Sequence, residues 1–122
     1  MGLDQYAYTR NENTKPSEAE PKFIWRKHAK LQEWMEQLFL EKTGQTSEKL
    51  NCGELELNSA DIEDLEALVN DRALPESPGG FFFGHQFQDE AAEDNRSQDL
   101  GFCAWALSEF NKGNRVYYSC WW

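Results

Sequence analysis

The 122-residue sequence has few cysteines and no long apolar run, and each shortage excludes a class of protein. Its three cysteines, Cys52, Cys103 and Cys120, form no CxxC pair, so neither a disulfide framework nor a zinc ribbon is predicted. No segment has the length and apolarity of a membrane span, and the start has no signal-peptide pattern. Tyr6 stands where N-myristoylation requires Ser or Thr. We therefore expect a soluble protein with free thiols in a reducing cytoplasm.

Basic residues are also scarce, with 12 Lys or Arg against 22 Asp or Glu and a pI near 4.6. Nucleic acids and anionic membranes carry negative charge, so the sequence predicts direct binding to neither, whereas a basic protein partner stays open. The charge is localised, because residues 54–109 contain 14 acidic residues and only Arg72 and Arg96 as bases.

Catalytic motifs are absent as well, including GxSxG, the P-loop, HExxH and GxGxxG. The two histidines, His28 and His85, have no Cys or His at ligand spacing, and we expect each to be hydrogen-bonded or solvent-facing. His85 could alternatively act as a base or ligand with Asp89, which leaves a weak enzyme as the least favoured class. The acidic stretch DEAAEDNRSQDL lacks the glycine and terminal Glu of a calcium loop. We predict a protein that is not an enzyme and that holds no metal or cofactor.

Hydrophobic patterning in the first half predicts a strand over residues 3–10 and a mobile loop over 11–21. A long helix is then expected from Pro21 to Thr43 and Gly44, followed by a loop over 44–51. The apolar residues expected on the buried face of that helix are Ile24, Leu31, Trp34, Met35 and Leu38.

The second half predicts a strand over 53–57, a helix capped by Asn58 or Ser59, and a short buried strand at Phe81–Phe83. The second helix should bury Ile62, Leu65, Leu68 and Val69. An acidic loop over 86–97, a central helix over 99–110 and a final strand over 115–122 are expected to follow. The order is βαβαβαβ, a single α+β domain spanning 1–122. About three helices should cover a mostly antiparallel sheet of about four strands, with both termini contributing strands.

The segment GGFFFGH, residues 79–85, concentrates three phenylalanines between glycines. A strand covered on both faces would bury all three side chains. The functional alternative is an aromatic wall over a small-ligand or nucleotide pocket, as in a sponge-type binding protein. Its lining would be Trp25, Phe82, His85 and Tyr118.

Eight carboxylates on the second helix and the following acidic segment recur at spacings of three or four residues. Crowded like charges destabilise a fold, so such rows favour a role beyond solubility, although a merely solvated face would show the same pattern. A dense anionic surface could imitate a nucleic acid and occupy the basic groove of a host protein. The predicted partner-binding residues are Glu63, Asp64, Glu66, Asp71, Asp89, Glu90, Glu93 and Asp94.

The stretches MGLDQYAY, WRKHAKLQEWM, CGELEL, LPESPGGFFFG and VYYSCWW occur here in that order. Together they resemble a group of small uncharacterised phage and prophage proteins. That group has a GLDMY-like start, a YWRKAN-like helix, a CGEYYV-like strand, a GFFFG segment and a YYQSSW-like end. Where it commonly has Asn and His, this chain has Ala29 and Gln32, so a polar site built on those side chains is not expected.

The resemblance implies a phage context without a mechanism. Combined with the acidic segment, it favours surface binding over a shared catalytic role. We therefore expect a cytoplasmic anti-defence inhibitor, similar to an anti-CRISPR protein, that blocks a basic host protein, for example a nucleic-acid-binding defence complex.

Overall fold

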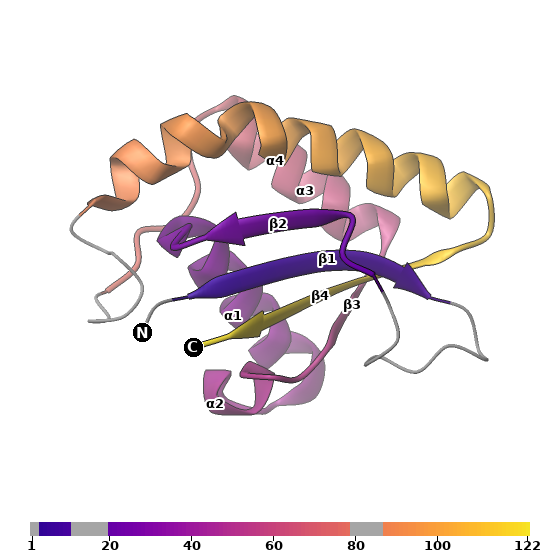
Figure 1. Cartoon of the computed structure of the whole chain (residues 1–122), viewed down its shortest axis with the longest axis horizontal. Helices are drawn as coiled ribbons and strands as arrows, with labels where there is room; N and C mark the ends of the chain where they lie inside the picture. The colour runs from indigo at the N-terminus through magenta and orange to yellow at the C-terminus, as the bar shows by residue number, and fades with distance from the viewer. Residues whose placement is uncertain (1–2, 11–19, 79–86) are drawn as a thin grey trace.

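The computed structural model describes residues 3–10, 20–78 and 87–122. They form a four-stranded antiparallel sheet in the order β2-β1-β4-β3, with the helices against one of its faces (Figure 1). The strands are β1 (Asp4–Arg10), β2 (Phe23–Arg26), β3 (Leu55–Leu57) and β4 (Arg115–Trp121). The helices are α1 (Ala29–Thr43), α2 (Ser47–Leu50), α3 (Ser59–Asn70) and α4 (Gln88–Asn111). The predicted α+β fold, with strands from both ends of the chain, is confirmed.

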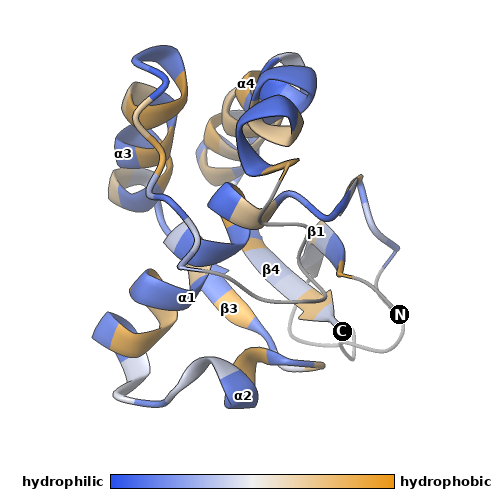
Figure 2. Ribbon diagram, turned by 90° about the vertical axis from the view of Figure 1, so that its left-hand side faces the viewer, coloured by the Kyte–Doolittle hydropathy of each residue, from blue (hydrophilic) through white to orange (hydrophobic). Residues whose placement is uncertain are grey.

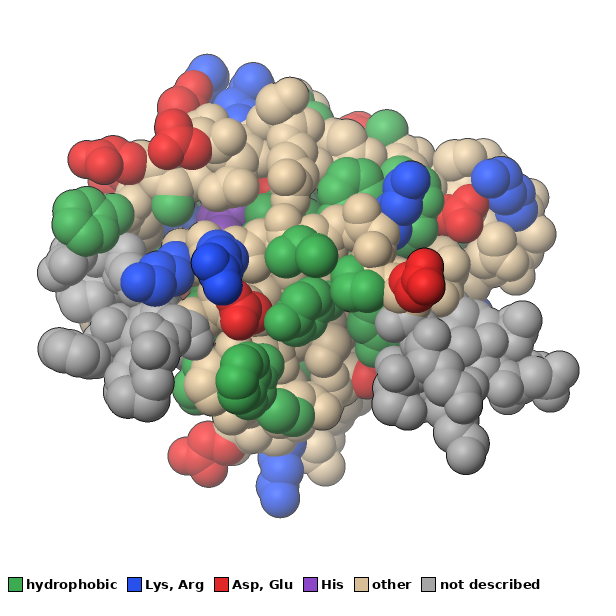
Figure 3. Space-filling view, viewed as in Figure 1, with side chains coloured by type: hydrophobic (Ala, Val, Ile, Leu, Met, Phe, Trp, Pro, Cys, Tyr) green, Lys and Arg blue, Asp and Glu red, His purple; other side chains and the backbone are tan. Residues whose placement is uncertain are grey.

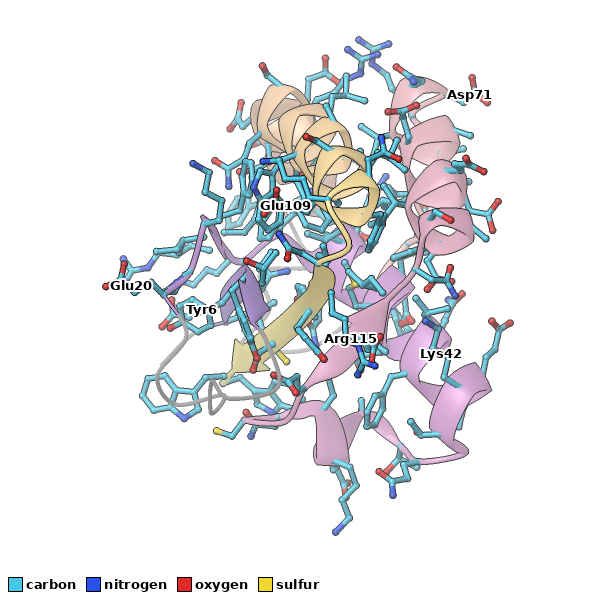
Figure 4. All side chains as sticks on the ribbon, turned by 90° about the vertical axis from the view of Figure 1, so that its right-hand side faces the viewer. Tyr6, Glu20, Lys42, Asp71, Glu109 and Arg115 are labelled. Carbon is cyan, nitrogen blue, oxygen red and sulfur yellow. The ribbon has the colours of Figure 1, made fainter. Side chains whose placement is uncertain are left out.

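The centre of the sheet is the β1–β4 pair, whose register runs from Asp4 opposite Trp121 to Arg10 opposite Arg115. Alternate side chains point into the core, because successive residues of a strand face opposite sides of the sheet. The inward set includes Leu3, Gln5, Ala7, Trp25, Leu55, Leu57, Val116, Tyr118 and Cys120. The opposite face carries Tyr6, which points away from the helices in Figure 4.

The helix expected to begin after Pro21 is wrong in its first part, because Phe23–Arg26 form strand β2. Buried Trp25 lies between Ile24 and Arg26, which are exposed, and this period of two fits an edge strand paired with β1. Lys27 has a positive φ of 52° and separates the strand from α1. The predicted end of the helix is correct: Gly44 takes the left-handed conformation and its N–H bonds to the Leu40 carbonyl.

The acidic loop expected over 86–97 is also wrong from Gln88 onward, because that segment forms the first half of α4. Asp89 and Glu90 occupy the first turn, where carboxylates interact favourably with the helix dipole. The loop expected over 44–51 contains a single helical turn, α2, held by fully buried Leu50. The expected Phe81–Phe83 strand lies outside the described residues, as does most of the loop assigned to 11–21.

The predicted start of α3 is correct in detail. Asn58 Oδ1 accepts from the Asp61 N–H at 2.9 Å, and Asp61 Oδ2 accepts from the Asn58 N–H at 2.9 Å, a reciprocal capping box. Ile62, Leu65 and Val69 form the buried stripe and Leu68 is half-buried. This stripe packs α3 beside α4, above the sheet in the view of Figure 2.

The outer edge of β2 is partly covered by a side chain from α4. Gln98 Nε2 donates a hydrogen bond to the Ile24 carbonyl at 2.7 Å. An unpaired strand edge is a template for pairing with another chain, and this contact occupies one of its acceptors.

Candidate functional site

The carboxylates predicted on α3 divide between its two sides. Glu63, Asp64 and Asp71 are exposed and lie away from the buried stripe, and Asp71 points outward at the end of the helix in Figure 4. Glu66 is half-buried and faces α4, where its charge contributes to raising the pKa of the Cys103 thiol. Three of the four residues therefore contribute to an outward-facing acidic surface.

The carboxylates predicted on α4 form two rows, because residues four apart lie one above the other on a helix. Glu90 and Asp94 make one row, and Asp89 and Glu93 make the other. All four residues are exposed. The second row differs in its surroundings, because it faces basic side chains from α1 and from the end of α3.

Two ion pairs neutralise that second row. Lys30 Nζ lies 2.7 Å from Asp89 Oδ1, and Arg72 donates to both carboxylate oxygens of Glu93 at 3.0 and 3.1 Å. Hydrogen bonds from Arg72 lower the pKa of Glu93. In Figure 3, basic and acidic side chains lie close together at the upper left of the molecule, on the side where α4 begins. The ion pairs of Asp89 and Glu93 thus join α4 to α1 and to the end of α3. These two carboxylates are therefore less available to a partner protein.

Five of the eight predicted residues remain exposed and form no ion pair with any residue that the structure describes. We call this set the acidic face: Glu63, Asp64, Asp71, Glu90 and Asp94. It lies on two adjacent helices within a strongly anionic part of the chain. Residues 59–72 and 88–99 together contain ten acidic residues and two arginines. These five residues thus belong to two helices in contact with each other, and the ion-paired row of α4 lies beside Arg72 at the end of α3.

A buried polar cluster was not found by sequence reasoning. Asp99, 1% exposed on α4, accepts from Trp25 Nε1 at 2.8 Å through one oxygen. Its other oxygen lies 2.7 Å from His28 Nε2, and His28 is fully buried. His28 Nδ1 has no hydrogen-bond partner among the described residues. The expected hydrogen bond to His28 is therefore present at Nε2, whereas Nδ1 is buried and unpaired among the described residues.

A second set of buried polar groups lies between the sheet and α1. Gln5 bonds to the backbone of His28 through both ends of its amide, at 2.9 and 3.2 Å, and donates to the Tyr118 hydroxyl at 3.0 Å. Tyr118 donates to Gln32, which donates to Cys120 Sγ at 3.5 Å. Burial raises the pKa of Tyr118 well above its ordinary value. Gln32, from which we expected no polar site, is therefore a member of the polar core.

The aromatic pocket considered as an alternative is not supported by the two of its residues that the structure describes. Trp25 is 1% exposed and Tyr118 is fully buried, and both hydrogen-bond inside the core. Phe82 and His85 lie outside the described residues, as does the pairing of His85 with Asp89. Trp25 and Tyr118 thus act as core residues here.

A cavity of about 220 Å³ lies between α3, α4 and the start of α1. Its apolar lining is Val69, Leu74 and Ala92. Its charged lining consists of Lys30, Arg72, Arg96, Asp89, Glu93 and Asp99. The cavity adjoins the ion-paired row of α4, so it is separate from the acidic face.

The described residues contain no group of three or more His, Cys, Asp or Glu side chains arranged to hold a metal ion. Cys52 is exposed, whereas burial raises the pKa of Cys103 and of Cys120 to about 12. The latter two thiols therefore stay protonated and unreactive near neutral pH. Within the described part of the chain, no helix combines the length and apolarity needed to cross a membrane.

Comparisons with protein-family models, curated proteins and solved structures give no match to this chain.

Proposed function

We propose that this protein is a non-enzymatic binding protein whose acidic face engages a basic surface on a partner protein. The observation that carries this proposal is the set of five exposed carboxylates on α3 and α4 that form no ion pair with a described residue. Like charges on adjacent helices repel each other, and a basic partner would relieve that repulsion on binding. Because helices hold these carboxylates, their charge can also speed the encounter with a basic partner by electrostatic steering.

The partner that fits such a surface is a protein that normally holds a nucleic acid. Its groove carries lysines and arginines, and an anionic protein surface can exclude the phosphate backbone from it. The resemblance to phage proteins supports an anti-defence role in the cytoplasm of a host cell, with a CRISPR effector complex as one example of the target. The same charge argues against direct binding of this protein to nucleic acid or to an anionic membrane.

The test uses purified DNA-binding defence complexes and measures binding across a salt series, with and without competing duplex DNA. We expect affinity to fall steeply with salt and binding to be mutually exclusive with DNA. The test variant changes the acidic face to amides: Glu63→Gln, Asp64→Asn, Asp71→Asn, Glu90→Gln and Asp94→Asn.

The matched control removes five negative charges elsewhere on the chain: Glu20→Gln, Glu33→Gln, Glu41→Gln, Glu48→Gln and Glu56→Gln. Both variants have the same net charge, so a difference between them reports the position of the charges. Binding that survives the change to the acidic face, or that is lost equally in the control, contradicts the proposal.

A further inference from the structure

The cavity between α3, α4 and the start of α1 has the size and lining of a small-ligand site. Its volume of about 220 Å³ exceeds the roughly 150 Å³ of an apolar cavity known to accommodate benzene. The cavity has an apolar wall made by Val69 and Leu74, which are buried, and by Ala92, which is half-buried. A molecule with one ring therefore fits, whereas a whole nucleotide is too large.

Among the residues that the structure describes, charge pairing leaves one cation of this lining without a carboxylate partner. Lys30 pairs with Asp89 and Arg72 pairs with Glu93. The third acid of the lining, Asp99, is held by Trp25 and His28. The basic residue that remains is Arg96, which is half-buried on α4.

The guanidinium of Arg96 is only partly bonded. Its Nη2 donates to the Asn70 carbonyl at 3.4 Å, while its Nε is buried and has no acceptor among the described residues. Arg96 contributes to lowering the pKa of Glu93, but the carboxylate of Glu93 is already bound through both oxygens by Arg72. Buried donors are nearly always bonded in folded proteins, and Arg96, whose side chain lines the cavity, is the residue at which an acceptor from outside the chain would complete the bonding.

We propose that this cavity binds a small carboxylic acid with an apolar body of about one ring, whose carboxylate is bound by Arg96. Guanidinium groups are planar, always charged and suited to holding carboxylates through hydrogen bonds. The one cation of the lining that has no ion pair with a described residue matches a single negative charge. Phosphates with two charges are disfavoured, because Asp89, Glu93 and Asp99 line the same cavity.

The proposal is independent of the acidic face, and its test uses benzoate as the probe. Isothermal titration and amide chemical shifts measure binding of benzoate, of its neutral analogue benzamide, and of inorganic phosphate to the whole chain. We expect benzoate to bind in the millimolar range or tighter, with shift changes at residues 69–74 and 89–99. Benzamide and phosphate should bind at least tenfold more weakly.

Two variants locate the site. Arg96→Gln should weaken benzoate binding at least tenfold, and Ala92→Leu should block the cavity while keeping the guanidinium. Arg26→Gln is the matched control, since Arg26 is an exposed arginine on β2 paired with Asp4. If benzamide binds as well as benzoate, if Arg96→Gln binds normally, or if none of the probes binds, the proposal is wrong.

Discussion

Replacement of Asp99 tests whether the buried cluster of Trp25, His28 and Asp99 stabilises the fold. Asp99→Ala removes the acceptor of Trp25 Nε1 and the partner of His28 Nε2, at 2.8 and 2.7 Å. Each bond involves a carboxylate in the core, and removing one partner of such a buried pair costs about 3–5 kcal/mol. Domains of this size have a free energy of unfolding of about 5–15 kcal/mol, so the loss is a large fraction of the total.

The same loss can be expressed as a melting temperature. Unfolding entropies near 2.1 cal/mol/K per residue imply a shift of roughly 4 °C per kcal/mol for a chain of this length. Asp99→Ala should therefore melt about 10–20 °C below the wild type. Asp99→Asn should lose less, because an amide can accept from Trp25 and donate to the ring nitrogen of His28.

The assay is urea and thermal unfolding followed by tryptophan fluorescence and circular dichroism. Asp71→Ala is the control, since Asp71 is exposed at the end of α3 and should change stability by no more than about 0.5 kcal/mol. The apolar triple variant Trp25→Phe, His28→Leu and Asp99→Leu should be more stable than Asp99→Ala, because it leaves no unpaired donor. If Asp99→Ala unfolds within 1 kcal/mol of the wild type, the cluster does not stabilise the fold as argued.

Three further predictions concern the thiols and a helix cap. In native protein near pH 8, one thiol per chain, Cys52, should react rapidly with a disulfide reagent and the other two only after unfolding; fast reaction of Cys103 or Cys120 contradicts their burial. The pKa of both buried thiols is about 12 in the folded protein and 9.0 when they are exposed, so both stay protonated in either state below pH 9. Between pH 9 and 12 the unfolded chain loses these protons while the folded protein keeps them, and the free energy of unfolding therefore falls. Urea unfolding at pH 10 should then give a free energy of unfolding about 3 kcal/mol lower than at pH 8, a difference that Cys103→Ala should reduce by about half. Asn58→Ala should lower the free energy of unfolding by about 1 kcal/mol through loss of the capping box, whereas Gln45→Ala, at an exposed position outside any helix, should not.

Sequence patterns over a few residues correctly predicted the elements that keep the same buried and exposed sides along their whole length. The stripe of Ile62, Leu65 and Val69, the cap at Asn58 and the end of α1 at Gly44 depend on neighbours within a few residues. Phe23–Arg26 were misassigned because their four residues fit a helix as well as a strand, and only pairing with β1 decides between them. The first half of α4 was misassigned because its charges indicated a loop, while Lys30 and Arg72, distant in sequence, bind two of those charges in the fold.

The candidate surface was partly predictable for the same reason. Carboxylate spacing along one helix is local information, and it correctly placed Glu63, Asp64 and Asp71 on the outside of α3. Which carboxylates are neutralised depends on cations from other elements, which spacing does not show. One signal of the buried cluster was present in the sequence: Asp99 stands at the start of the stripe that includes Phe102, Cys103 and Ala106, where a charge requires a partner.

The position of β4 between β1 and β3 has a consequence for how the chain folds during synthesis. Residues 4–10 leave the ribosome well before their main partner, the strand at 115–121, which follows them by more than a hundred residues. Closing a loop of that length is slow. Until β4 has paired with β1, the apolar faces of α3 and α4 have no complete sheet to pack against. Nascent chains that stop before Arg115 should therefore be bound by chaperones or degraded, and folding should be completed only after β4 has emerged.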